Sequence, residues 1–208
     1  MQQSFDINKA ILFINNYNIG YQYTKKELKV YYEWFMANID NHLRQFSDKI
    51  NSFGENVGWV NDFTPESLKR LGYILYANVN GIFISEEEYQ RRVEAAHIVL
   101  KDSVMHVEMT HDERVLTFLL SVYVGEVIIR SYPNDNLKWE LSKFTKSFAH
   151  CGYMLIHIAP FIYSAPLDPA NWLMIGILKD KYENQKIDLN LLYDNYCKVT
   201  RTLREKSI

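Results

Sequence analysis

One acidic residue lies inside the most apolar stretch of the chain and is the first candidate for chemistry. Glu126 follows Tyr123 and Gly125 in the run from Val115 to Ile129, which is otherwise uncharged. A carboxyl group withdrawn from water has a raised pKa unless it is paired, and catalytic acids are made in this way. Arg130 stands four residues later, on the same face of a helix, where it can hold Glu126 in a structural ion pair. The segment therefore leaves two interpretations open, a functional acid and a structural pair.

The functional interpretation predicts a pocket around Glu126. Its expected binding residues are Tyr123, Glu126, Arg130 and Trp139. Trp139 is included because it follows the helix in a segment with a strand-like pattern, which would form the other wall of the pocket. Under this hypothesis the chain is an enzyme or a small-ligand-binding protein, with the pocket between the central helix and a β-ribbon. No individual catalytic residue is predicted.

The histidines and cysteines have spacings that do not suit a metal site. His106 and His111 are five positions apart, whereas two ligands on one helical face are three or four apart. His150, Cys151 and His157 provide fewer ligands than a structural zinc site needs. We therefore expect no metal and no cofactor.

Signatures of other functional classes are missing from the sequence. None of its 8 glycines falls in a GxGxxG or GxxxxGK[ST] phosphate-binding loop, and no GxSxG nucleophile turn is present. The formal net charge is -2, from 25 acidic and 23 basic residues, so no basic excess exists to displace counterions from nucleic acid. These absences favour a protein without enzymatic activity over an enzyme, and nucleic-acid binding is not expected.

Composition indicates one globular domain over residues 1–208. The chain is 48% hydrophobic and 14% aromatic, which is ample material for a single core. The first residues do not resemble a secretory signal, and the uncharged apolar run 115–125 is shorter than the roughly 20 residues of a membrane span. Cys151 and Cys197, which form no CxxC pair, are expected to be reduced thiols. A cytoplasmic protein without membrane contact is predicted.

Helix starts are marked where Ser or Thr precedes Glu by three positions, or where Pro follows a capping residue. The starts found in this way are Thr24, Ser85 and Thr110, and the pairs Thr64-Pro65 and Asp168-Pro169. A short helix near the N-terminus and a last helix from Asp188 complete the set. Apolar residues at helical spacing predict one long amphipathic helix from Leu28 to Ile50, and the helix 115–129 is placed at the centre.

Two segments after the central helix favour strands, Leu137–Phe144 and Gly152–Ile158. The predicted fold class is mainly α (α+β), a single-domain bundle of about six to seven helices. A small β-hairpin is expected between the central helix and the C-terminal helices. Trp59, Trp139 and Trp172 are expected near loops and element ends, where rigid rings serve as interface anchors.

Three short motifs resemble those of a family of small uncharacterised bacterial proteins. They are Asp62-Phe63-Thr64-Pro65-Glu66-Ser67-Leu68, Tyr123-Val124-Gly125-Glu126 and Leu137-Lys138-Trp139, followed by Pro166-Leu167-Asp168-Pro169. The resemblance covers the middle and C-terminal two thirds of the chain. It implies a bacterial origin and a shared fold, and it brings no established activity.

Two functional hypotheses follow. The first is a non-enzymatic interaction protein of the immunity or antitoxin type, whose partner is another protein, because the chain is small and mildly acidic and lacks a catalytic constellation. The alternative is the small-ligand-binding protein or enzyme with the pocket around Glu126. A structural or oligomeric scaffold role, or nucleic-acid binding by a local patch that the net charge hides, is left as a third class.

Overall fold

Helices make up most of the chain in a computed structural model that describes residues 5–15, 24–54, 59–96, 104–142, 154–159 and 162–205. The described helices are α1 (Ile7–Asn15), α3 (Lys25–Ala37), α4 (Ile39–Ser52), α5 (Pro65–Asn78), α6 (Glu86–Ala95), α7 (His111–Ser131), α8 (Leu167–Glu183) and α9 (Leu191–Arg204). The described strands are β1 (Ile82–Phe83), β2 (Val107–Glu108), β3 (Trp139–Leu141), β4 (Met154–Ala159) and β5 (Ile162–Ser164). The prediction of a mainly α fold with a small β component is confirmed.

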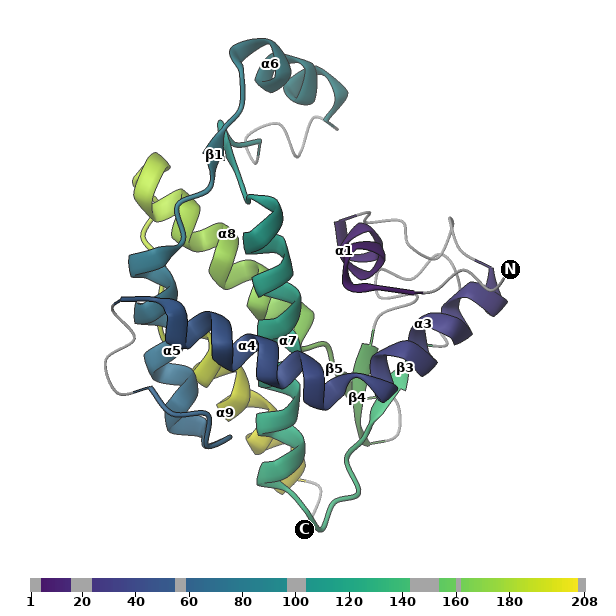
Figure 1. The fold of residues 1–208 in the computed structure, drawn as a ribbon. Coiled ribbons are helices and arrows are strands. Elements are labelled where there is room, and N and C mark those ends of the chain that lie inside the picture. The colour runs from purple at the N-terminus through teal and green to yellow at the C-terminus, as the bar shows by residue number, and fades with distance from the viewer. Residues whose placement is uncertain are drawn as a thin grey trace.

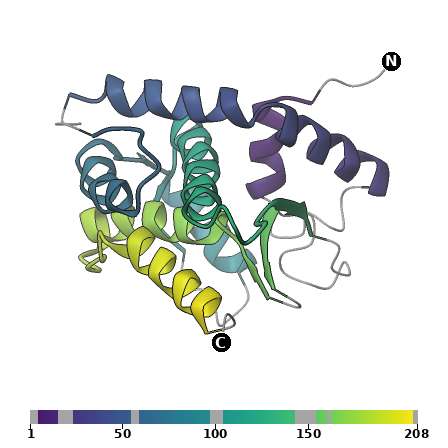
Figure 2. The ribbon, with the colours of Figure 1, turned by 90° about the horizontal axis from the view of Figure 1, so that it is seen from below.

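Helix α7 lies at the centre, as its all-round apolar character predicts. Every residue from Leu116 to Ile128 is buried, including the polar ones. Helices α1, α4, α8 and α9 all contact it, and Figure 2 shows α4 on one side of α7 with α8 and α9 on the other. A helix that is apolar on every face needs such neighbours all round, and here it organises the core.

The prediction of one long helix from Leu28 to Ile50 is wrong. The helix is interrupted at Asn38, where φ is -118° and ψ is 8°, and divides into α3 and α4. The Asn38 side chain donates to the carbonyl of Trp34 at 2.8 Å, and its backbone N–H donates to Phe35 at 3.1 Å. Asparagine competes with helix continuation through such local bonds, and the apolar spacing carries no signal of them.

The predicted capping residues form all, some or none of the expected capping hydrogen bonds. Thr110 forms both bonds of a capping box with Glu113 at the start of α7. Ser85 caps α6 through the Glu88 backbone N–H alone, because the Glu88 carboxylate instead binds arginines. Thr64 precedes α5 as expected, but its hydroxyl donates to Asp62 rather than capping the helix.

The predicted start of the last helix at Asp188 is wrong by three residues. Helix α9 begins at Leu191 with Asn190 as its N-cap. The Asp188 carboxylate accepts from the Asn190 backbone N–H at 2.9 Å, so Asp188 makes the turn that precedes the helix. Asx turns and N-caps use the same residue types, which explains the displacement.

Two antiparallel sheets are present among the described residues. The predicted hairpin corresponds to β3 and β4, with Trp139 opposite Ile156, and β5 adds a third strand on the other edge of β4. A second sheet pairs β1 with β2 and was not predicted, because two-residue strands have no readable alternation. None of the described helices is long and apolar enough to cross a membrane.

Candidate functional site

The predicted residues Glu126, Arg130 and Trp139 come together on one side of α7. One Glu126 oxygen accepts from the Trp139 indole Nε1–H at 2.9 Å, and the other accepts from Arg130 Nε–H at 3.1 Å. The Glu126 side chain is 10% exposed and the Arg130 side chain 43%. The expected ion pair is thus present, and its arginine end reaches solvent. The indole partner, which spacing along α7 could not reveal, ties the central helix to β3.

Tyr123 lies one turn before Glu126 and points into an aromatic cluster. Its ring stacks on Phe46 at a centroid distance of 5.0 Å and lies 5.3 Å from Phe63. Its hydroxyl shares a 2.7 Å hydrogen bond with Ser67. Burial raises the pKa of Tyr123 to about 12, so the phenol stays protonated across the physiological range.

Phe63 connects the two halves of this site. The Arg130 guanidinium carbon lies 3.7 Å from the centroid of its ring, a cation–π contact. Phe63 has a φ of 55°, a left-handed conformation that costs a bulky residue free energy. Phe63 and Ser67 belong to the first sequence motif, Glu126 to the second and Trp139 to the third. The three motifs therefore meet in space, and we call this group the motif junction.

The chemistry available at the motif junction is that of a buried acceptor with two donors. Both Glu126 oxygens are engaged by charge-assisted or indole hydrogen bonds, which orient the carboxylate between a helix and a sheet. These contacts favour the structural interpretation of Glu126. Arg130 remains the member that an anion in solvent can approach, which is the feature that keeps the pocket hypothesis open.

Gly125 leaves no room for a side chain between α7 and the Trp139 ring. A Cβ built on Gly125 would lie 2.1 and 2.2 Å from two carbons of the Trp139 ring. We expect Gly125→Ala to lower the free energy of unfolding by about 2 kcal/mol, because the buried ring must move or distort the helix. Chemical denaturation of the variant, with Gly54→Ala as the control in open space, measures this. Equal stability of the two variants would contradict the close packing.

His42 is a buried titratable residue that no motif or spacing in the sequence singles out. It is 2% exposed, and neither ring nitrogen has a hydrogen-bond partner among the described residues. The rings of Trp34, Phe35 and Phe118 surround it, with centroid distances of 4.9, 6.2 and 5.2 Å. Burial lowers the pKa of His42 to about 4. His42 is therefore a neutral imidazole in an aromatic cage between α3, α4 and α7.

The expectation that three tryptophans serve as interface anchors fails for two of them. Trp59 and Trp139 are buried core residues, whereas Trp172 on α8 is 59% exposed. Trp59 packs against Phe46 and Tyr123. Position near a loop does not determine whether a ring faces solvent, since a loop that folds over the core buries its aromatic residue.

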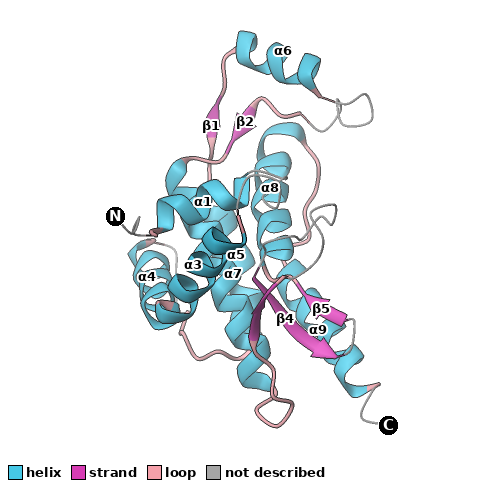
Figure 3. Ribbon diagram, turned by 90° about the vertical axis from the view of Figure 1, so that its right-hand side faces the viewer, coloured by secondary structure: helices cyan, strands magenta, loops and turns pink. Residues whose placement is uncertain are grey.

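An arm formed by residues 82–96 and 104–108 projects from the helical body (Figure 1). Strands β1 and β2 form its stem, and α6 lies at its outer end (Figure 3). None of the residues of α6 is buried. An isolated helix of this length is marginal in water, so contacts with the stem must hold it in place.

Arginine and glutamate side chains brace the arm. Arg92 donates to Glu88 at 2.6 Å and to Glu108 on β2 at 3.1 Å. Arg114, near the start of α7, donates to the same Glu108 oxygen at 3.2 Å. Hydrogen bonds from Arg91 and Arg92 hold the pKa of Glu88 well below its ordinary value. The network runs from α6 through the stem to the body.

The base of the arm is fixed by Glu113. One of its oxygens accepts from the backbone N–H groups of Asn80 and Gly81, at 2.8 and 2.9 Å, and the other accepts from Thr110. Although burial alone would raise it, these donors keep the pKa of Glu113 below its ordinary value. Gly81 has a φ of 64°, which allows the chain to turn into β1.

Apolar side chains stand exposed on the stem. Phe83 is 69% exposed and Ile82 is 49% exposed. The ring of Phe83 touches Tyr182 of α8 edge to face, at a centroid distance of 5.1 Å, and Tyr182 is itself partly exposed. The patch formed by Ile82, Phe83 and Tyr182 is the apolar surface at the root of the arm.

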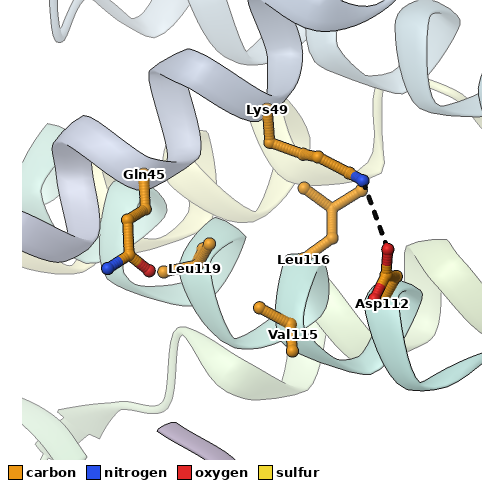
Figure 4. A pocket seen from close by; sticks show the side chains of 6 residues that line it. All are labelled: Gln45, Lys49, Asp112, Val115, Leu116 and Leu119. Atoms are coloured by element: carbon orange, nitrogen blue, oxygen red, sulfur yellow. Dashed lines mark ion pairs between the residues drawn. The ribbon is translucent and has the colours of Figure 1, made fainter.

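A depression of about 200 Å³ lies between α4 and α7 on another part of the body. Gln45 and Lys49 of α4 and Asp112, Val115, Leu116 and Leu119 of α7 line it (Figure 4). Lys49 Nζ and an Asp112 oxygen are 3.5 Å apart across its opening. The depression therefore has an apolar floor and a charged rim.

Metal ligands do not converge within the part of the chain that the structure describes, where no three His, Cys, Asp or Glu side chains are placed to hold an ion. His106 stacks on Tyr89, and His111 contacts Asn8. His150 and Cys151 lie outside the described residues. Cys197 is a free thiol.

The resemblance that the three motifs suggest stays a prediction. Comparisons of the chain with protein-family models, with curated proteins and with solved structures found no match.

Proposed function

We propose that the protein acts in the bacterial cytoplasm by binding another protein, as immunity and antitoxin proteins do, and that the arm makes the contact. The observation that carries the proposal is Phe83, a large ring left 69% exposed on an element that projects from the body. Aromatic residues of this kind dominate the binding energy of protein interfaces.

The bracing of the arm supports this function. A helix that buries none of its residues adds little to the stability of the fold. Even so, Arg92 links it to the stem through ion pairs with Glu88 and Glu108. A surface fixed before binding loses less conformational entropy on association, which raises affinity.

Charge on the arm favours a partner with basic residues beside an apolar pocket. The arginines of α6 are paired internally with Glu88 and Glu108, whereas Glu87 and Glu94 face solvent. The charge offered to a partner is therefore negative, next to Ile82 and Phe83. Such complementarity speeds association and selects the partner.

Site-specific photo-crosslinking in the organism that encodes the chain tests the proposal. Benzoylphenylalanine is placed at Phe83 in the full chain, with Val60 as a matched control because it is an exposed apolar residue, 63% exposed, in a loop of the body. One protein recovered from position 83 and not from position 60 is the expected result. The same adducts at both positions, or none at position 83, would contradict the arm as the interface.

A ligand pocket at the motif junction is the second candidate function, favoured by the exposure of Arg130 beside Glu126. In this alternative Tyr123, Glu126, Arg130 and Trp139 bind a small anionic ligand, and Glu126 orients the guanidinium. The stability of Glu126→Gln, alone and combined with Arg130→Met, distinguishes this function from a structural role.

A further inference from the structure

We propose that two copies of the chain associate through the outer face of α8, with the two helices antiparallel across a two-fold axis. This face carries a row of residues at steps of three, four and three positions, which are Trp172, Ile175, Lys179 and Tyr182. We call this row the α8 seam. It meets the arm only at Tyr182, and the proposal does not rest on the protein-binding function.

Helix α8 is apolar on two faces, and only one of them packs in the core. Helices α5, α7 and α9 contact it on the side that buries Leu173, Met174 and Ile177. On the other side Trp172 is 59% exposed and Tyr182 is 40% exposed, and the residues between them on the α8 seam are half-buried. Single apolar residues are ordinary on a protein surface, whereas a line of them marks a contact with another molecule.

The spacing of the α8 seam favours a second helix as the contact. Alternating steps of three and four are the repeat that keeps one stripe of a helix against a neighbouring helix. A two-fold axis near Ile175 sets this residue against its own copy and sets Trp172 of each chain against Lys179 of the other. A two-fold contact requires a surface that is complementary to itself. The α8 seam meets this requirement, because an indole face attracts an ammonium group.

Charge along α8 determines the antiparallel orientation. Asp168 lies one turn before Trp172, and Lys179 lies toward the other end of the helix. An antiparallel copy brings the carboxylate of each chain toward the ammonium group of the other, whereas a parallel copy would oppose the two lysines. The methylene groups of Lys179 also cover part of the Trp172 ring. Because the contact is only about three helical turns long, we expect a weak dimer.

Sedimentation equilibrium of the purified full chain tests the association. We expect a monomer–dimer equilibrium with a Kd of about 50 µM. Trp172→Ser and Lys179→Glu are each expected to weaken it at least about tenfold, whereas Lys179→Arg keeps the cation and should change it by less than about twofold. Tyr73→Ser is the matched control, since Tyr73 is also 59% exposed but lies on α5. A chain that is monomeric up to about 500 µM, or a dimer that Trp172→Ser leaves intact, would overturn the proposal.

Disulfide trapping tests the position of the two-fold axis. In a chain that carries Cys151→Ser and Cys197→Ser, a cysteine can bond its own copy only where it lies near the axis. Mild oxidation of Ile175→Cys in this background is therefore expected to give a covalent dimer. Tyr73→Cys is the control and should give at least about tenfold less, because α5 lies away from the axis. No covalent dimer from Ile175→Cys, or equal amounts from both variants, would refute the antiparallel α8 contact.

Discussion

Replacing Arg130 by Met is expected to lower the free energy of unfolding by about 3 kcal/mol, and replacing Glu126 by Gln by about 2 kcal/mol. The costs differ because Arg130→Met leaves a carboxylate that is only 10% exposed without its cation, whereas Glu126→Gln leaves a guanidinium that is 43% exposed and can be solvated. In Glu126→Gln the amide oxygen still accepts from the Trp139 indole, but the amide N–H₂ then faces Arg130 Nε–H. Urea unfolding of each variant measures the costs.

The double variant Glu126→Gln with Arg130→Met is expected to cost no more than about 2 kcal/mol, because it removes both charges and keeps an acceptor for Trp139. Simple addition of the two single costs would show that the side chains do not interact. A melting temperature that is unchanged or raised in Glu126→Gln alone would identify Glu126 as a strained functional acid. That result would favour the ligand pocket at the motif junction over protein binding as the function of the chain.

Acid is expected to destabilise the protein through His42. Burial lowers its pKa from 6.5 to about 4, so the folded state keeps the imidazole neutral while the unfolded chain takes up a proton. Stability from this residue is complete above pH 6.5 and is lost as the pH falls to about 4, by about 3 kcal/mol in total. The rings that surround His42 are apolar and carry no carboxylate that would stabilise a protonated imidazole.

Comparison with His42→Phe isolates this effect from the titration of carboxylates. The variant places an apolar ring in the same aromatic cage and should lack this share of the acid sensitivity. The difference in unfolding free energy between the two proteins is measured in urea at several pH values, with His157→Gln as the control because His157 is partly exposed. A difference that does not change between pH 7 and about pH 4 would show that His42 can be protonated in the folded state.

The sequence predicted those contacts that depend on spacing along one helix. The Glu126–Arg130 pair and the Thr110 capping box are both local, since their partners are four and three positions apart. For Trp139 the sequence predicted only a position near Glu126, and neither its hydrogen bond to Glu126 nor its packing on Gly125. The stacking of Phe63 on Arg130 joins residues far apart in the chain, which periodicity cannot report.

The arm and the buried histidine were missed for a different reason. The capped segment from Ser85 was expected to be an ordinary helix of the bundle, because Tyr89 and Val93 have helical apolar spacing. Whether such a helix packs on the core depends on the stem that carries it, and β1 and β2 are two residues each. His42 shares the apolar face of α4 with Phe46, but a lone histidine in a helical pattern does not indicate burial.

The affinity of the partner captured at position 83 for Phe83→Ser, measured by isothermal titration calorimetry, tests the central claim most directly. Tyr73→Ser is the matched control, since Tyr73 is an exposed aromatic residue, 59% exposed, on α5 of the body. We predict that Phe83→Ser weakens binding by at least about thirtyfold, as expected for an interface hot spot, while Tyr73→Ser binds like the unaltered chain. Unaltered affinity of Phe83→Ser would contradict the arm as the binding surface.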